Sequence, residues 1–202
     1  MKNNELLYLE INNHLYDEKP SEYFEIAYKD PDFSNYPFIM LSKLKQTKQS
    51  PKYHPEGSVW NHTMMVIDEA AKIKYRSKAP HVFMWAALLH DIGKPTTTRY
   101  RRGKLTAYDH DKEGAILAKT FLYEFTNDAN FVENVVKLIR WHMQILFVVK
   151  NMPFADIKTM KKEVDIKEVA LLGFCDRLGR LNVDREKEDE NIRIFLDKCG
   201  KL

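Results

Sequence analysis

Histidines and aspartates of this chain are spaced so that several would project from helices into one interior. His62 shares a predicted helix face with Val66 and Ile73, and His142 shares a face with Ile139. A buried imidazole or carboxylate must be hydrogen-bonded, paired or bound to metal. Mixed imidazole and carboxylate ligands suit Mn, Fe, Ni, Co or Zn. The remaining members of this set are His90, Asp91, His110 and Asp176.

Each of these residues also has a simpler interpretation. A single buried histidine is usually a hydrogen-bonded core residue, and an aspartate such as Asp176 is usually a cap or a salt-bridge partner. Six such residues aimed at one core favour a shared site over six separate explanations. By contrast, His54 and Glu56 are expected to structure a loop, and His14 and His81 are expected at the surface.

The elements that would position this set are helices. Ser58 is a suitable N-cap, Pro80 a suitable first residue, and Gly93 a suitable helix end. Asp109 is expected to cap the helix that carries His110, and Asp165 with Glu168 resembles a capping box. The predicted helices cover residues 5–15, 22–28, 37–45, 59–76, 80–93, 110–126, 130–149, 166–182 and 184–198.

The exception to the helical pattern is the segment 97–107. Residues that favour strands flank Arg102 and Gly103, which predicts a small β-hairpin. The 202 residues contain only 7 Gly and 8 Pro, which argues against many short strands joined by turns. The predicted fold class is therefore all-α, with one hairpin after the His90-Asp91 pair.

Composition predicts an ordinary globular chain of one domain. Hydrophobic residues make up 44% and charged residues 30%. The net charge of +3 is too small to indicate a nucleic-acid or membrane protein by itself. Cys175 and Cys199 lack zinc-ligand spacing and fit a reducing compartment. With no signal pattern or membrane-length apolar run, the chain is expected to be cytoplasmic, without a membrane partner.

The sequence around these residues resembles the HD superfamily of metal-dependent phosphohydrolases. The matching segments are HTMMVIDEA around His62, LLHDIGKP around His90 and Asp91, and LLGFCDRLG around Asp176. The resemblance is closest to the HD domain that bacterial CCA-adding tRNA nucleotidyltransferases carry C-terminally. It rests further on YHPEGSVWNHT, RGKLTAYDHDKEGA and LIRWHM, and it covers residues from about 51 to 182.

This resemblance implies an HD-domain helical bundle over 1–202, with an N-terminal helical extension (1–50), a core (51–182) and a C-terminal helix (183–202). The chain shows no Gly-Ser opening followed by paired catalytic aspartates. We therefore expect a free-standing HD domain without CCA addition.

The resemblance also implies the ligand set. His62, His90, Asp91 and Asp176 would hold a first divalent metal (Mn, Fe, Ni or Co, with Mg as a further candidate). His110 and His142 match positions that bind a second ion in two-metal HD proteins, with Asp91 shared. The alternative is one ion, with both histidines hydrogen-bonded to substrate phosphate.

Basic residues follow the His-Asp pair. Lys94 is expected to contact a phosphate oxygen, with a solvated cation at the helix end as the alternative. Arg99, Arg101, Arg102 and Lys104 would rim the site and attract anionic substrate, or would be a solvated hairpin edge.

Together these features predict hydrolysis of phosphomonoesters or phosphodiesters. A metal would activate water for attack on phosphorus, with Asp91 orienting that water and Lys94 assisting. The expected substrates are nucleotides, other small phosphate esters or short RNA ends, including 2′,3′-cyclic phosphates by resemblance. The alternatives are a nucleotide- or RNA-binding HD module without catalysis, or a metal that only staples the helices. No oligomeric state is predicted.

Overall fold

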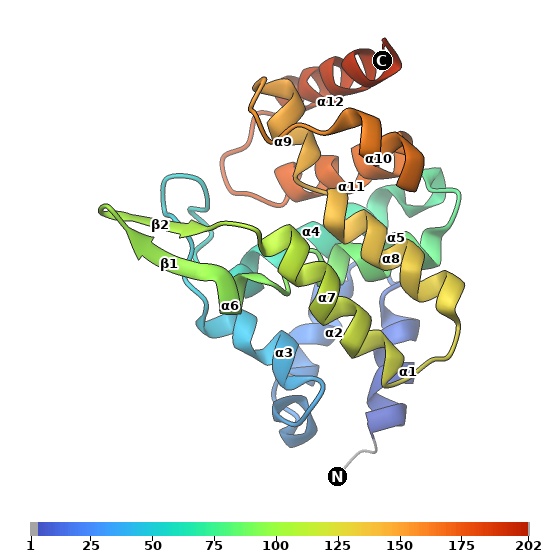
Figure 1. The fold of residues 1–202 in the computed structure, drawn as a ribbon. Helices are drawn as coiled ribbons and strands as arrows, with labels where there is room; N and C mark the ends of the chain where they lie inside the picture. The colour runs from blue at the N-terminus through green and yellow to red at the C-terminus, as the bar shows by residue number, and fades with distance from the viewer. Residues whose placement is uncertain (1–3, 202) are drawn as a thin grey trace.

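The computed structural model describes residues 4–201 and is built almost entirely of helices (Figure 1). The α-helices are α1 (Asn4–His14), α2 (Pro20–Ala27), α3 (Ile39–Ser42), α4 (Val59–Ile73), α5 (Pro80–Leu89), α6 (Lys94–Thr97), α7 (His110–Tyr123), α8 (Ala129–Trp141), α9 (Gln144–Val149), α10 (Ile157–Glu163), α11 (Ile166–Leu178) and α12 (Arg185–Gly200). Short 3₁₀ segments are η1 (Pro31–Ser34), η2 (Lys43–Gln46) and η3 (Lys74–Arg76). The predicted all-α class is confirmed.

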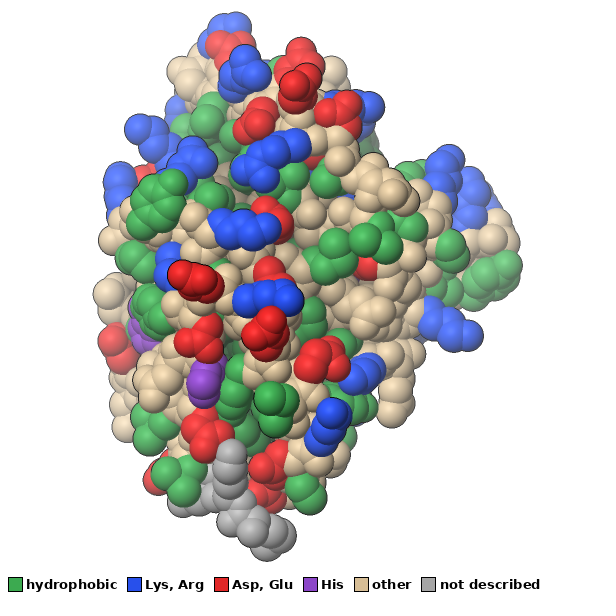
Figure 2. Space-filling view, turned by 180° about the vertical axis from the view of Figure 1, so that it is seen from behind, with side chains coloured by type: hydrophobic (Ala, Val, Ile, Leu, Met, Phe, Trp, Pro, Cys, Tyr) green, Lys and Arg blue, Asp and Glu red, His purple; other side chains and the backbone are tan. Residues whose placement is uncertain are grey.

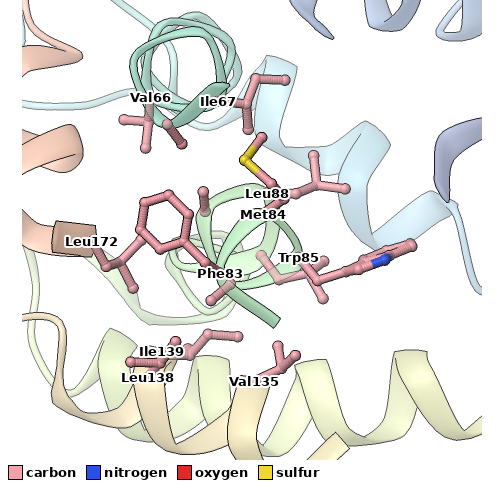
Figure 3. Packing of buried hydrophobic residues seen from close by; sticks show 14 of the residues in the cluster. Val66, Ile67, Phe83, Met84, Trp85, Leu88, Val135, Leu138, Ile139 and Leu172 are labelled. Atoms are coloured by element: carbon pink, nitrogen blue, oxygen red, sulfur yellow. The ribbon is translucent and has the colours of Figure 1, made fainter. Parts of the chain in front are cut away.

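Helix α5 is the centre of the core because it is apolar on every side. Figure 3 shows its Phe83, Met84 and Leu88 between side chains of α4, α8 and α11. Helix α4 packs on α5 and α11, and α8 packs on α5 and α7. Full burial of one such side chain contributes about 1.5–3 kcal/mol, so this layer fixes the helices that carry the candidate residues.

The N-terminal helices cover one side of this core. Helix α2 packs against α4, and the indole Nε1 of Trp60 donates to Glu25 at 2.7 Å. At the other end, α12 packs on α9 and α11, at the red end of Figure 1. Within residues 4–201, no helix is both long and apolar enough to cross a bilayer.

The predicted hairpin is confirmed as β1 (Thr98–Arg101) and β2 (Lys104–Ala107), which pair antiparallel. Arg102 and Gly103 both have positive φ, 48° and 75°, as a tight two-residue hairpin turn requires. The hairpin projects from the helical body beside α6 and α7 (Figure 1).

The structure corrects three helix boundaries. Helix α5 ends at Leu89, so His90, Asp91 and Gly93 lie in a turn before the short α6. The predicted helix 130–149 is broken at residues 142–143 into α8 and α9. Helix α11 ends at Leu178, where Gly179 follows.

Two predicted caps are also wrong. Asp109 adopts a left-handed conformation and pairs with Lys112 at 2.8 Å instead of capping α7. Glu168 leaves the predicted capping box and accepts from Ser77 Oγ at 2.6 Å, because a buried carboxylate needs a donor. The Ser58 and Asp165 caps are confirmed, since their side chains accept from Asn61 N and Lys167 N.

Candidate metal centre

Helix α4 brings His62 to the end of α11. His62 lies in the first turn of α4, and its Nε2 is 3.0 Å from Asp176 Oδ1. Gly179 makes this approach possible, because a Cβ at that position would collide with Val66 on α4. The carbonyl of Gly179 in turn accepts from His62 Nδ1 at 2.9 Å. The close crossing of α4 and α11 therefore both places and orients His62.

The His90-Asp91 pair sits where α5 ends. His90 Nε2 lies 3.2 Å from Asp91 Oδ2, and His62 Nε2 lies 3.8 Å from the same oxygen. A Cβ at Gly93 would collide with the His110 carbonyl and the Gly114 backbone nitrogen, so glycine lets α7 begin directly beside the pair. This contact explains Gly93 better than the predicted helix stop, because its φ is −80°.

His110 and His142 complete the cluster from the opposite side. His110, the first residue of α7, places Nε2 3.4 Å from Asp91 Oδ1. Its Nε2 also lies 3.2 Å from Nε2 of His142, which ends α8 at the break before α9. The two oxygens of Asp91 thus face two different groups of histidines.

All four histidines are oriented in the same way. In each, Nδ1 is within hydrogen-bond distance of a backbone carbonyl: Gly179 for His62 (2.9 Å), Ala87 for His90 (2.9 Å), Ala107 for His110 (2.7 Å) and Ile139 for His142 (2.6 Å). Because a carbonyl accepts only, Nδ1 carries a proton, so in the neutral form of each ring Nε2 presents a lone pair. Such backbone hydrogen bonds are the usual way that proteins orient histidine ligands.

The Nε2 atoms of His110 and His142 face each other with no proton between them. This arrangement indicates whether a cation fits the site. With Nδ1 protonated in both His110 and His142, their Nε2 atoms at 3.2 Å cannot hydrogen-bond each other. Within the described residues, the buried His90 Nε2 also forms no hydrogen bond of good geometry. Buried lone pairs that face one another without a hydrogen bond cost folding free energy unless a cation lies between them.

The protonation preferences agree with this arrangement for His110 and His142, whereas hydrogen bonds to Asp176 and Glu56 outweigh burial and raise the pKa of His62. Burial lowers the pKa of His142 to about 4 and also lowers the pKa of His110, so both favour the neutral, ligating form. Burial would raise the pKa of Asp91, but the adjacent His90 ring and the Lys94 ammonium hold it well below its usual range. Arg180 and His62 do the same for Asp176.

The donor atoms divide into two groups that share Asp91. One group is His62, His90 and Asp91, and the other is Asp91, His110 and His142; within each group the donor atoms lie within 4.8 Å of one another. Asp176 adjoins the first group through its 3.0 Å contact with His62. The structure therefore brings all six predicted ligand residues together.

Lys94 belongs to the same cluster and is not the solvated cation of the alternative expectation. Its Nζ lies 2.6 Å from Asp91 Oδ2 and donates to Gln49 Oε1 at 2.6 Å. The Lys94 side chain is 11% exposed. A cation that is nearly buried beside a carboxylate is held by charge pairing.

The basic hairpin stays apart from the cluster. In the described part of the chain, no hydrogen bond or ion pair joins Arg99, Arg101, Arg102 or Lys104 to the six ligand residues. These four side chains are exposed, and Arg101 lies over the Tyr108 ring at 5.0 Å. Basic side chains gather on the projecting arm at the right of Figure 2. The predicted contact of the hairpin with substrate stays a prediction.

Two further residues, which the sequence did not single out as ligands, contact members of the cluster. Glu56 Oε1 lies 3.1 Å from His62 Nδ1 and 2.8 Å from His54 Nδ1. Arg180 Nη2 lies 3.1 Å from Asp176 Oδ1. The sequence signals were present: Glu56 comes six residues before His62, and Arg180 lies one helical turn after Asp176.

Comparison with known proteins places this cluster in a family. The family model of the HD domain matches residues 59–181. The chain is 28% identical over 138 residues to the Multifunctional CCA protein of Thioalkalivibrio sulfidiphilus, and 26% identical over 166 residues to that of Methylococcus capsulatus. These matches cover 68% and 80% of this chain but 32% of each relative.

A third relative matches along more of the chain. The Multifunctional CCA protein of Paraburkholderia phytofirmans is 33% identical over 200 residues, which is 95% of this chain and 47% of that protein. The chain thus spans about a third to a half of the length of these relatives. The matched region of the HD model includes all six clustered residues.

Proposed function

Because the chain belongs to the HD domain family, we propose that it is a metal-dependent phosphohydrolase whose metal centre is this cluster of four histidines and two aspartates. The observation that carries the proposal is the orientation of the histidines. Four Nε2 atoms, each on a ring that a backbone hydrogen bond at Nδ1 orients, face two carboxylates in a buried space. This donor set suits Mn, Fe, Ni or Co, with Mg as a weaker candidate.

The ligands fall into two sets in this proposal. His62, His90, Asp91 and Asp176 hold the first ion, and His110 and His142 hold a second ion with Asp91 shared. The separate directions of the two Asp91 oxygens support this division, since Oδ2 faces His90 and Oδ1 faces His110. When bound, the metal supplies Lewis acidity that activates water and polarises a phosphoryl group.

The remaining chemistry falls to Asp91 and Lys94. The low pKa of Asp91 keeps it ionised, so it can orient the attacking water and accept its hydrogen bond. Lys94 donates to a phosphoryl oxygen as a point charge, and its 2.6 Å contact with Asp91 shows how near it lies to the ligands.

The substrate class that we propose is a nucleotide or a short RNA end, including 2′,3′-cyclic phosphates. Residues 94–108 contain five Lys and Arg and no Asp or Glu, whereas the rest of the chain contains 27 basic and 29 acidic residues. This concentration of positive charge on and below the hairpin supports an anionic substrate, with Arg99, Arg101 and Arg102 as binding residues. The resemblance to the HD domain of CCA-adding tRNA nucleotidyltransferases supports a connection with RNA, and the relatives named above are Multifunctional CCA proteins.

We further propose that the chain forms one HD domain. Residues 1–50 are an N-terminal extension, 51–182 are the core and 183–202 contribute the C-terminal helix. Helix α2 packs on α4, and α12 packs on α11. Because both end segments contact helices that carry proposed ligands, this packing supports a single domain.

A screen of phosphate esters tests the function. The purified protein would be stripped with a chelator, reloaded separately with Mn²⁺, Fe²⁺, Ni²⁺, Co²⁺ or Mg²⁺, and assayed for phosphate ester hydrolysis. Nucleoside monophosphates, 2′,3′-cyclic nucleotides and short RNAs ending in phosphate would be the substrates. We expect turnover only after reloading. Binding of a nucleotide or RNA with no turnover under any metal would favour the non-catalytic module instead.

A further inference from the structure

Each carboxylate of the cluster has a cation one helical turn further along the chain. Lys94 follows Asp91 by three residues and contacts its Oδ2 at 2.6 Å. Arg180 follows Asp176 by four residues, and its Nη2 lies 3.1 Å from Oδ1 and 3.4 Å from Oδ2. The two cations therefore contact different members of the ligand set.

The guanidinium of Arg180 has more donors than this contact uses. Arginine carries five N–H donors, and the contact with Asp176 is made by Nη2. Its Nε is buried and forms no hydrogen bond within residues 4–201. Nearby Arg177 also has a buried Nε with no hydrogen bond among the described residues, but its charge pairs with Glu188, outside the cluster, at 2.6 Å.

The exposed fractions of the side chains show where a substrate can reach the cluster. The side chains of His62, His90 and Asp91 are 0–2% exposed and form the closed wall. Exposure rises to 11% for Lys94, 12% for Asp176 and 25% for Arg180. Access is therefore greatest at Arg180 and smaller at Asp176 and Lys94.

A small pocket adjoins the ligands at this side. It is lined by candidate ligands and both arginines together with apolar residues: His142, Met143, Ile145, Leu146, Gly173, Asp176, Arg177 and Arg180. The break between α8 and α9 and the close packing of Ile145 on Gly173 shape it. Of its two arginines, Arg180 is the one that contacts a candidate ligand, Asp176, whereas the charge of Arg177 is paired with Glu188.

We propose that Arg180 binds the phosphoryl group of the substrate, as a second phosphate-binding cation in addition to Lys94. The inference rests on the proposed function for the identity of the ligand as a phosphate ester. Arginine suits this role because its planar fork can donate two parallel hydrogen bonds to phosphate oxygens.

Charge balance supports the same assignment. A divalent ion held by Asp176 would offset the carboxylate charge that now pairs with Arg180. The guanidinium would then lie near a cation in a poorly solvated site, which is unfavourable unless an anion joins them. A phosphoryl group supplies that anion, and Arg180 can reach it with donors that Asp176 does not use.

The competing role for Arg180 is positional: it would only hold Asp176 for the metal. Binding of Mn²⁺ and of inorganic phosphate, measured separately by calorimetry, distinguishes the two roles. The variants are Arg180→Gln, which removes the charge, and Arg180→Lys, which keeps the charge but loses the fork. Arg193→Gln on the exposed face of α12 is the matched loss of one positive charge.

We expect Arg180→Gln to weaken phosphate binding to the Mn²⁺-loaded protein at least tenfold while Mn²⁺ affinity changes less than threefold. Arg180→Lys should show an intermediate loss, and Arg193→Gln none. If Arg180→Gln does not fold, the Arg180→Lys comparison decides by itself. Unchanged phosphate affinity, or a loss that only follows lost Mn²⁺ affinity, would overturn the proposal.

An assay of ester hydrolysis by the wild type distinguishes a failure of this inference from a failure of the proposed function. If the wild type binds Mn²⁺ and phosphate through Arg180 but hydrolyses no ester, the proposed function fails and the phosphate site stands. If the wild type hydrolyses esters while Arg180→Gln keeps the same KM and the same inhibition by phosphate, the function stands and the role of Arg180 fails.

Discussion

His62 Nε2 lies 3.0 Å from Asp176 Oδ1, although the two residues are 114 positions apart in the chain. The contact depends on the crossing of α4 and α11, where Gly179 leaves room for Val66. The centre is thus assembled by helix packing, because its ligands come from α4, α7, α11 and the turns that follow α5 and α8. Any change that separates these helices is expected to weaken metal binding before it unfolds the core.

Glu56 is predicted to strengthen metal binding through His62. Its carboxylate lies 3.1 Å from His62 Nδ1 and increases the basicity of the opposite ring nitrogen. Glu56→Gln should lower Mn²⁺ affinity by about 10–100-fold, the usual effect of losing a hydrogen-bond partner of a ligand. Calorimetry would measure it, with the exposed Glu186→Gln as the control. Equal affinities in both variants would exclude this role.

The stability of the metal-free protein is predicted to fall in mild acid, partly through His54. Burial lowers the pKa of His54 to about 4, below its usual 6.5. Between these pH values the unfolded chain binds more protons, so the free energy of unfolding falls as pH falls. The contribution is at most about 3 kcal/mol. Urea unfolding at pH 7 and 4.5 should show a smaller pH difference for His54→Gln than for the wild type. An identical difference would contradict this assignment.

The number of ions is predicted to be two per chain. His142→Ala removes one donor from the group that contains His110 and leaves the donors around His62 intact. Titration with Mn²⁺ should therefore change from two ions to one tightly bound ion. His14→Ala, which alters a histidine outside the cluster, should retain two. Saturation of the wild type at one ion, with His142→Ala unchanged in affinity, would favour the single-metal alternative.

The exposed hairpin is predicted to help substrate binding more than the chemical step. In the double variant Arg101→Ala, Arg102→Ala, KM should rise while kcat stays nearly unchanged. The reason is that the hairpin would bind the substrate and the transition state equally well. The fall of kcat/KM with salt should become less steep, and an RNA end should be affected more than a mononucleotide. Arg76→Ala, Arg193→Ala removes two exposed charges elsewhere as the control. Equal KM and salt response in both double variants would leave the hairpin as a solvated edge.

The sequence was sufficient to predict the helical class, the hairpin and which histidines and aspartates lie together in one cluster. These depend on local signals, such as the Ser58 cap, the Arg102-Gly103 turn and the apolar faces of the helices. The break after His142 could not be predicted, because Ile145 packing on Gly173 is a contact between distant segments. The burial of Lys94 and the pairing of Arg180 with Asp176 also required the fold, since exposed and buried cations have the same local sequence pattern.

The measurement that tests the account most directly compares Mn²⁺ binding by the wild type and by Asp91→Asn. Asp91 is shared by both donor groups, and asparagine keeps its size while removing its charge. Circular dichroism would verify that the helices remain. The account predicts that the wild type binds Mn²⁺ and gains phosphohydrolase activity, and that Asp91→Asn loses both together. Wild-type affinity for Mn²⁺ in a folded Asp91→Asn protein would contradict the assignment of this cluster as the metal centre.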